Sequence, residues 1–176
     1  ETTKAALTGV TDALVLGGEA VVTPLTQSYL DETLGSAHVT RLAGNDRYKT
    51  AVAVAQYAVR DAGHTWDGVG ITTGQNFPDA LSGAARAGAE GSPVLLVQPT
   101  AVPASVCTEL KRLSPTVVTA LGGDGAVSNA TLRAAALRCP APAPAPNAQC
   151  TNVAGPGLDG ALARPAVEDA LAAIRS

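Results

Sequence analysis

The sequence contains few of the residues that usually fill a large hydrophobic core. Only 3% of its 176 residues are aromatic, with one Trp, one Phe and three Tyr, and Met is absent. The hydrophobic fraction of 46% therefore rests largely on Ala, Val and Leu. Because protein interiors pack at crystal-like density whatever residues they use, these small side chains must bring the backbones close together. A core organised around large aromatic rings is excluded.

Positive charge is also scarce. The chain has 12 Lys and Arg against 15 Asp and Glu, a net charge of −3 and a pI of about 5.3, and no more than two basic residues are adjacent. Nucleic acids and anionic membranes are bound by basic surfaces, and a membrane helix needs roughly 20 apolar residues in a row. We therefore expect no nucleic-acid partner and no membrane. Glu1 is typical of an interior position, so the lack of a signal peptide says nothing about export.

The cysteines do not form a metal-binding pattern. Cys107, Cys139 and Cys150 contain no Cys-x-x-Cys pair, and the two histidines are distant in sequence, so no metal is expected. In an exported protein we expect one disulfide and one remaining thiol. A Cys139–Cys150 bond would close a loop around a proline-rich segment, whereas Cys107–Cys139 would join two helices. Those helices are expected to run parallel, which weighs mildly against the second pairing but leaves it open.

The middle of the chain, residues 41–97, has the pattern strand, helix, strand, helix, strand. Asp46 is placed to cap the first helix. Asn76 can cap the second, which carries Asp79 in its first turn and is rich in Ala, Gly and Ser. Pro93–Val97 is wholly apolar, as in strands buried on both faces of a parallel sheet. The pattern predicts an α/β fold with a mainly parallel sheet flanked by small-residue helices.

Four ordered motifs within about residues 41–138 carry a family resemblance: RLAGNDRYKTA, TGQNFPDALSGA, SPVLLV and LGGDGAVS. This set resembles the cell-wall-binding repeat 2 family of Gram-positive surface proteins. The resemblance implies a secreted protein located at the cell wall or cell surface. It also implies non-covalent anchoring to a wall polymer rather than catalysis. Repeats of this family typically occur as three in tandem around a pseudo-threefold axis, so other copies of the repeat are expected partners.

An internal repeat divides the chain. ALVLGGEAVVT at 13–23 matches TALGGDGAVS at 119–128, with two Gly-Gly pairs in phase about a hundred residues apart. A period this long indicates tandem domains. The expected divisions are the second half of one repeat, a complete repeat, a Pro/Ala spacer and a tail with a short helix: 1–35, 36–139, 140–146 and 147–176.

Two clusters are candidate ligand-binding residues. Arg41, Asp46 and Arg47 either form a helix cap with an arginine beside it or line a polymer-binding surface. Asn76 and Asp79 follow a strand at its carboxyl end, where open α/β sheets place ligands, and they either cap the helix or bind hydroxyl groups. Positive charge for an anionic polymer is also available from Lys49 and Arg86. Phe77, between Asn76 and Asp79, is expected to pack into the core.

The Gly-Gly pairs are interpreted as structural turns between a strand and a helix: Gly17, Gly18, Gly122 and Gly123. LGGDGAVS matches neither G-x-G-x-x-G nor the phosphate-binding P-loop, and its acidic residue opposes phosphate, so no cofactor is expected. Ser128 is expected to cap the following helix, and Gly123 to need a positive φ or a close backbone approach.

No arrangement of nucleophile, base and acid predicts an enzyme. Ser82 lies in no G-x-S-x-G motif, and neither histidine has an acid at a telling spacing. The preferred function is a non-catalytic module that binds a cell-wall polymer. One alternative is a self-assembling structural module of a surface layer or filament. The other is a cell-wall hydrolase or a regulator of one.

Overall fold

The computed structural model describes residues 5–139. Its strands and helices, in chain order, are β1 (Ala13–Leu16), α2 (Pro24–Leu34), a 3₁₀ turn (Ser36–His38), β2 (Val39–Leu42), α3 (Arg47–Asp61), β3 (Gly68–Thr73), α4 (Pro78–Ala89), β4 (Val94–Val97), α5 (Ala104–Leu113), β5 (Val117–Ala120) and α6 (Asn129–Ala136). The proline spacer, the tail and Cys150 lie outside the described residues.

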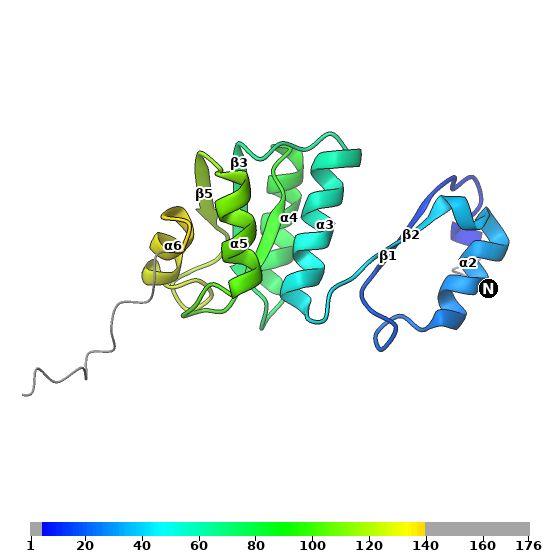
Figure 1. Cartoon of the computed structure of the whole chain (residues 1–176), viewed down its shortest axis with the longest axis horizontal. Helices are drawn as coiled ribbons and strands as arrows, with labels where there is room; N and C mark the ends of the chain where they lie inside the picture. Colours follow the sequence, from blue (N-terminus) through cyan, green and yellow to red (C-terminus); the bar gives the residue numbers. More distant parts are fainter. Residues whose placement is uncertain (1–4, 140–176) are drawn as a thin grey trace, which may run out of the picture. The chain divides into compact units, whose positions relative to one another are not determined.

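All paired strands of the two sheets are parallel. β3 lies between β4 and β5, with Gly70 opposite both Val94 and Thr119. Helices α3 and α5 lie side by side over one face of these strands, and α4 covers the other face (Figure 1). β1 and β2 form a separate pair in which Leu16 is opposite Leu42. The predicted α/β fold with a mainly parallel sheet is confirmed.

The core lies between the β4-β3-β5 sheet and the helices α3, α5 and α6. It consists of small and medium aliphatic side chains with no aromatic residue among its fully buried members: Ala55, Val69, Ile71, Leu95, Val97, Val106, Leu110, Val127 and Ala135. The expectation that β4 is buried on both faces is wrong, because β4 is an edge strand and its Val94 and Leu96 are only half-buried.

Helix α4 packs on the sheet through one narrow face. A Cβ atom on Gly83 would come within 2.7 Å of Leu121, so only glycine permits this approach, and Ala87 is buried. Most of the other small residues of α4 are exposed. Close packing by small residues is therefore confined to one face of the helix.

The start of α4 differs from the prediction. The N-cap position is Phe77, not Asn76, and no side chain caps the helix. Pro78 at the first position has no N–H to satisfy, and Asp79 complements the positive helix end, so a side-chain cap is less needed. Phe77 is 72% exposed rather than packed in the core, because the loop from Gln75 onward is exposed.

The internal repeat is visible as repeated geometry. The first glycine of each pair has a positive φ, 115° at Gly17 and 112° at Gly122. The carbonyl of the second glycine accepts two backbone hydrogen bonds in both copies, at Gly18 and at Gly123. We expected the constrained position at Gly123, but the structure places it at Gly122.

The helix that follows each turn also starts in the same way. Thr23 and Ser128 occupy the N-cap with φ and ψ of −60° and 154° in one copy and −62° and 152° in the other. The Ser128 hydroxyl accepts a hydrogen bond from Thr131 N at 3.2 Å, as predicted. β1, its turn and α2 are therefore the structural equivalents of β5, its turn and α6.

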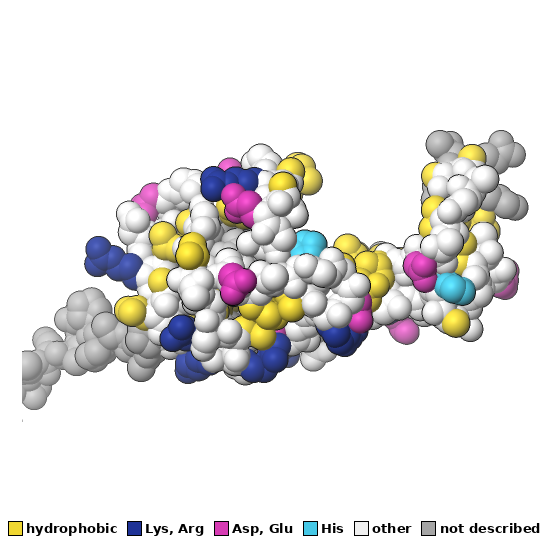
Figure 2. Space-filling model, turned by 90° about the horizontal axis from the view of Figure 1, so that it is seen from above, with side chains coloured by type: hydrophobic (Ala, Val, Ile, Leu, Met, Phe, Trp, Pro, Cys, Tyr) yellow, Lys and Arg dark blue, Asp and Glu magenta, His cyan; other side chains and the backbone are white. Residues whose placement is uncertain are grey.

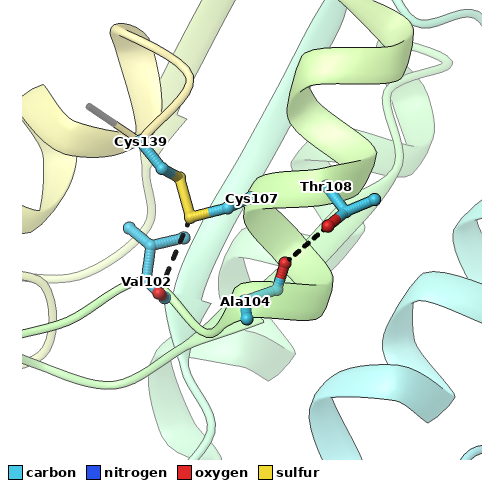
Figure 3. Close-up of a disulfide and its surroundings, with 5 residues drawn as sticks. All are labelled: Val102, Ala104, Cys107, Thr108 and Cys139. Carbon is cyan, nitrogen blue, oxygen red and sulfur yellow. Dashed lines mark hydrogen bonds between the residues drawn. A yellow bond between two sulfur atoms is a disulfide. The ribbon is translucent and has the colours of Figure 1, made fainter. Parts of the chain in front are cut away.

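A disulfide joins α5 to the end of α6. Cys107 and Cys139 are bonded, with 5.4 Å between their Cα atoms (Figure 3). The argument against this pairing is wrong. Parallel helices would place the start of one far from the end of the other, but α6 has only 8 residues and the chain turns after it, through positive φ at Arg138 and Cys139. The end of α6 therefore reaches the first turns of α5.

Candidate functional site

The first turn of α3 and the loop after β3 meet at the carboxyl edge of the sheet. The Arg47 guanidinium donates a hydrogen bond to the Gly74 carbonyl. Gly74 lies so close beneath α3 that a Cβ atom there would be 2.9 Å from the Tyr48 ring. Arg47 is exposed, so it can hold the loop and still present its remaining N–H groups to a ligand.

Asp46 caps α3, as its position in the sequence indicates. Its Oδ1 accepts a hydrogen bond from Lys49 N at 2.7 Å, and its backbone carbonyl accepts one from Thr50 N at 3.0 Å. The expected arginine beside this carboxylate is not seen, since Arg47 binds Gly74 instead. Asp46 therefore has a structural role, and its side chain is exposed at the start of α3.

Arg41 does not join this group. Its NH1 donates to the Gly17 carbonyl at 2.7 Å and its Nε donates to Gln27 Oε1 at 2.7 Å, so the half-buried guanidinium holds β2 to β1 and α2. Its NH2 is buried and has no partner among the described residues. The three predicted residues thus do not form one group: Arg41 links β2 to β1 and α2, whereas Asp46 and Arg47 stand at the start of α3.

Asp79 lies against the Gly-Gly turn. A Cβ atom on Gly122 would be 2.6 Å from Asp79 Oδ2, so the bare α-carbon of this glycine makes room for the half-buried carboxylate. Asn76 is exposed in the loop that precedes α4. The loop after β3 and the first turn of α4 therefore place an amide and a carboxylate at the carboxyl edge, where the Gly122 turn after β5 meets Asp79.

A cavity of about 260 Å³ lies beside α4, toward the amino-terminal ends of β3 and β5. Gly68 and Gly70 leave its floor without side chains, and the Arg86–Glu90 ion pair, at 2.9 Å, lies at its margin. We did not predict this cavity. The available signal was the alternation of glycines in β3, which removes every side chain on one face of that segment.

A second, shallower hollow of about 440 Å³ is lined by Gln56, Val59, Arg60, Trp66 and Arg112. Both of its arginines are paired on their own helices. Arg60 lies 2.6 Å from Asp61, and Arg112 lies 2.7 Å from Glu109. The Glu109 carboxylate raises the pKa of Arg112 through their hydrogen bond. Since both arginines have a carboxylate partner, this hollow presents less net positive charge than its residues suggest.

The surface carries no single large basic patch on the face that Figure 2 shows, where basic side chains stand at several separate places. Within residues 5–139, no three His, Cys, Asp or Glu side chains gather as metal ligands would. None of the helices in the same part of the chain combines the length and the apolar character needed to cross a bilayer.

Comparison with known proteins identifies relatives of this arrangement. The family model described as "Cell wall binding domain 2 (CWB2)" matches residues 41–132, just over half of the chain. No curated protein matches the sequence.

Two solved structures have a similar fold. For Cwp6 from Clostridium difficile the TM-score is 0.66 at 25% identity, over 74% of this chain and 20% of that one. For Cwp8 from Clostridium difficile it is 0.56 at 23% identity, over 73% of this chain and 20% of that one. The chain thus matches about a fifth of the length of each of these proteins.

Proposed function

Because the chain belongs to the cell wall binding domain 2 family, we propose that it is a non-catalytic anchoring module that holds a secreted protein to a wall polymer of a Gram-positive bacterium. The family match over residues 41–132 carries this proposal, and the likeness to Cwp6 supports it. Together they support the coarser statement that the chain is a cell-wall-associated module. The non-catalytic role and the polymer are the proposed part.

We place the polymer contact at the carboxyl edge of the sheet, with Arg47, Asn76 and Asp79 as contact residues and Asp46 as their support. An acidic protein needs local positive charge to bind an anionic secondary polymer. Of the basic residues considered from the sequence, Arg41 is engaged between strands and Arg86 is paired with Glu90. Arg47 and Lys49 are exposed on the first turn of α3, beside the exposed Asn76.

Wall binding is tested with purified sacculi. The chain should sediment with intact sacculi, remain in the supernatant when the anionic secondary polymer has been extracted, and release no muropeptides. Undiminished binding to extracted sacculi would disprove recognition of the secondary polymer. Release of muropeptides would show a hydrolase and disprove the non-catalytic role.

The contact residues are tested with matched arginine variants. Arg47→Ala should weaken sedimentation with sacculi, whereas Arg133→Ala, which removes an exposed arginine from α6, should not. Both variants are compared by circular dichroism, because Arg47 also holds the Gly74 loop. Equal sedimentation of the two variants would move the site away from the carboxyl edge.

Self-assembly into a surface layer or filament is the second candidate function. Large apolar side chains are exposed on the β1 and α2 segment: Leu14 44%, Leu16 51%, Val21 79% and Leu25 79%. Exposed apolar surface of this kind promotes association. Growth of large assemblies without sacculi, seen by light scattering and electron microscopy, would favour this function.

A further inference from the structure

The two equivalent strands, β1 and β5, have neighbours on different edges. In β5, Leu121 N donates to Ile71 O at 2.8 Å and so faces β3. In β1, Gly17 N donates to Leu42 O at 2.9 Å and so faces β2. Gly17 is the equivalent of Gly122, the residue that follows Leu121. Because successive N–H groups along a strand point to opposite edges, β2 occupies the edge of β1 that corresponds to the outer edge of β5.

The registers give the same result. Leu16 is opposite Leu42 and Ala120 is opposite Ile71, yet Leu16 is the equivalent of Leu121, one position further on. The bonding positions of β1 are therefore offset by one residue from those of β5. Because the N–H and C=O groups of successive residues point to opposite edges, a one-residue offset means that β1 and β5 form their hydrogen bonds along opposite edges.

The outer edge of β5 is unpaired within the described residues, since the sheet order is β4-β3-β5. Two side chains of this edge strand are exposed on the face that α4 covers, Val117 at 56% and Thr119, and both line the cavity there. A parallel strand with an open apolar edge is a template for a further strand. In β1 the corresponding edge is paired with β2, and Val39 and Leu42 of β2 are buried.

We propose that the outer edge of β5 is a docking site for a parallel strand of the β2 type, with the pattern Val-x-Arg-Leu, supplied by another repeat of the family. The arginine would donate to the carbonyl of Gly122, an exposed residue, as Arg41 donates to Gly17 O. The pattern occurs once in this sequence, at 39–42, where it is paired with β1. The occupant therefore comes from a second repeat, in tandem or in another molecule.

The test uses the whole 176-residue chain and a labelled peptide of residues 36–46, SAHVTRLAGND. Fluorescence anisotropy should show saturable binding. Amide exchange should slow at Val118 and Ala120, whose N–H groups face the outer edge, and remain unchanged in β4. A scrambled peptide should not bind. Absence of saturable binding, or equal binding of the scrambled peptide, would overturn the proposal.

Two variants, one in the chain and one in the peptide, test whether the peptide binds at the outer edge of β5 or elsewhere. Ala120→Pro removes an outward N–H without touching the β3 ladder, and proline is tolerated at sheet edges. It should weaken binding by up to about tenfold, since one hydrogen bond contributes about 0.5–1.5 kcal/mol. If this variant does not fold, a peptide with Arg41→Ala, bound to the unaltered chain, should show weaker binding. Full affinity of both variants would overturn the proposal.

Amide exchange of the chain alone supplies a further check. If Val118 and Ala120 are already protected without peptide, the outer edge is occupied by another part of the chain or by a second copy paired differently. That result would also overturn the proposal. Rapid exchange at these two amides, slowed by the peptide, is the expected outcome.

Discussion

Single residues decide whether the strand-to-helix turns can form, and Gly122 is the most constrained of them. Its φ of 112° lies in a region that L-amino acids with side chains rarely adopt, and the Asp79 carboxylate fills the space where a Cβ atom would be. Gly17 has the same φ, 115°, but a Cβ atom there would only touch Val21 at 3.6 Å. A side chain at either Gly17 or Gly122 would thus strain the backbone, whereas only at Gly122 would it also clash with a neighbouring side chain.

Gly122→Val should lower the free energy of unfolding by roughly 1–3 kcal/mol from backbone strain alone, and by more once the clash with Asp79 is added. Thermal melting followed by circular dichroism measures the change. Gly123→Val is the control, because nothing lies within 4 Å of a Cβ atom at Gly123 and its φ is not positive. Equal melting temperatures for the two variants would show that the turn is unconstrained.

Asp46→Ala should lower the free energy of unfolding by about 0.5–2 kcal/mol, as loss of an N-cap usually does. The reason is that Lys49 N loses the acceptor that it has at 2.7 Å. Asn45→Ala, at the neighbouring exposed position, should have little effect on denaturant unfolding. If Asp46→Ala is as stable as the parent chain, the cap contributes nothing measurable and the carboxylate is left to ligand binding alone.

At the scale of elements, a contact between an aspartate and a histidine side chain lies at the start of the β1–β2 pair. Asp12 and His38 directly precede the first residues paired in register, Ala13 and Val39, and Asp12 Oδ1 lies 3.0 Å from His38 Nδ1. The hydrogen bond with His38 lowers the pKa of Asp12 below 3.8, helped by one with Thr11. A carboxylate with a lowered pKa stabilises the folded state above its unfolded pKa, and this contribution is lost as the pH falls through the folded value.

We therefore expect this contact to stabilise the β1–β2 pair at neutral pH, and the pair to loosen as the pH falls below the usual aspartate pKa of 3.8. A carbon-detected NMR titration of Asp12 should give a midpoint below the usual aspartate value. In a His38→Ala variant the midpoint should return toward that value. An unchanged midpoint would mean that the contact does not persist in solution.

The disulfide between α5 and α6 should contribute about 3–4 kcal/mol by the loop-entropy estimate, since 32 residues separate its cysteines. Reduction should lower the urea midpoint accordingly. Cys150→Ser should leave the link to Cys107 intact under non-reducing peptide mapping, whereas Cys139→Ser should abolish it. A linked Cys139–Cys150 peptide in the map of the unaltered chain would show that the other pairing forms.

Much of the element pattern was predictable because it depends on local chemistry. The caps at Asp46 and Ser128, the parallel strands and the repeated Gly-Gly turns all follow from short-range patterns. The wrong predictions concern the burial of β4, the cap of α4, the packing of Phe77 and the choice of Gly123, and the mild argument against the Cys107–Cys139 bond also failed. Each depends on where an element lies or ends in space: β4 is an edge strand, α4 begins in an exposed loop, the first glycine bends the chain, and α6 stops early.

The candidate site was predictable only in part, for a related reason. Sequence spacing predicted that Asn76 and Asp79, around the start of α4, would stand at the carboxyl end of a strand. It did not show that Arg41 is engaged with Gly17, because that bond joins residues 24 positions apart in the sequence. The cavity beside α4 depends on which face of β3 its glycines leave bare, and this is set by tertiary packing.

At the scale of the whole molecule, the exposed apolar side chains of β1 and α2 predict association. No residue of α2 is buried within the described part of the chain: Leu25 is 79% exposed, and Tyr29, Leu30 and Leu34 are only half-buried. We expect the chain to associate with itself, most simply as a closed trimer. Light scattering at tens of micromolar should give about three times the mass of 17.5 kDa. A stable monomer would contradict this.

The Cys107–Cys139 bond also has a mechanical consequence. A force applied C-terminal of Cys139 passes through the sulfur atoms into α5, so β5 and α6, which lie between the two cysteines, carry none of it. Because 32 residues separate the cysteines and an extended residue spans about 3.3–3.6 Å, the oxidised chain should release about 110 Å less contour length than the reduced one when stretched. Single-molecule pulling from the C-terminal side measures this difference. Tension from that side would then leave β5 folded, with its open edge still available, until α5 itself unfolds.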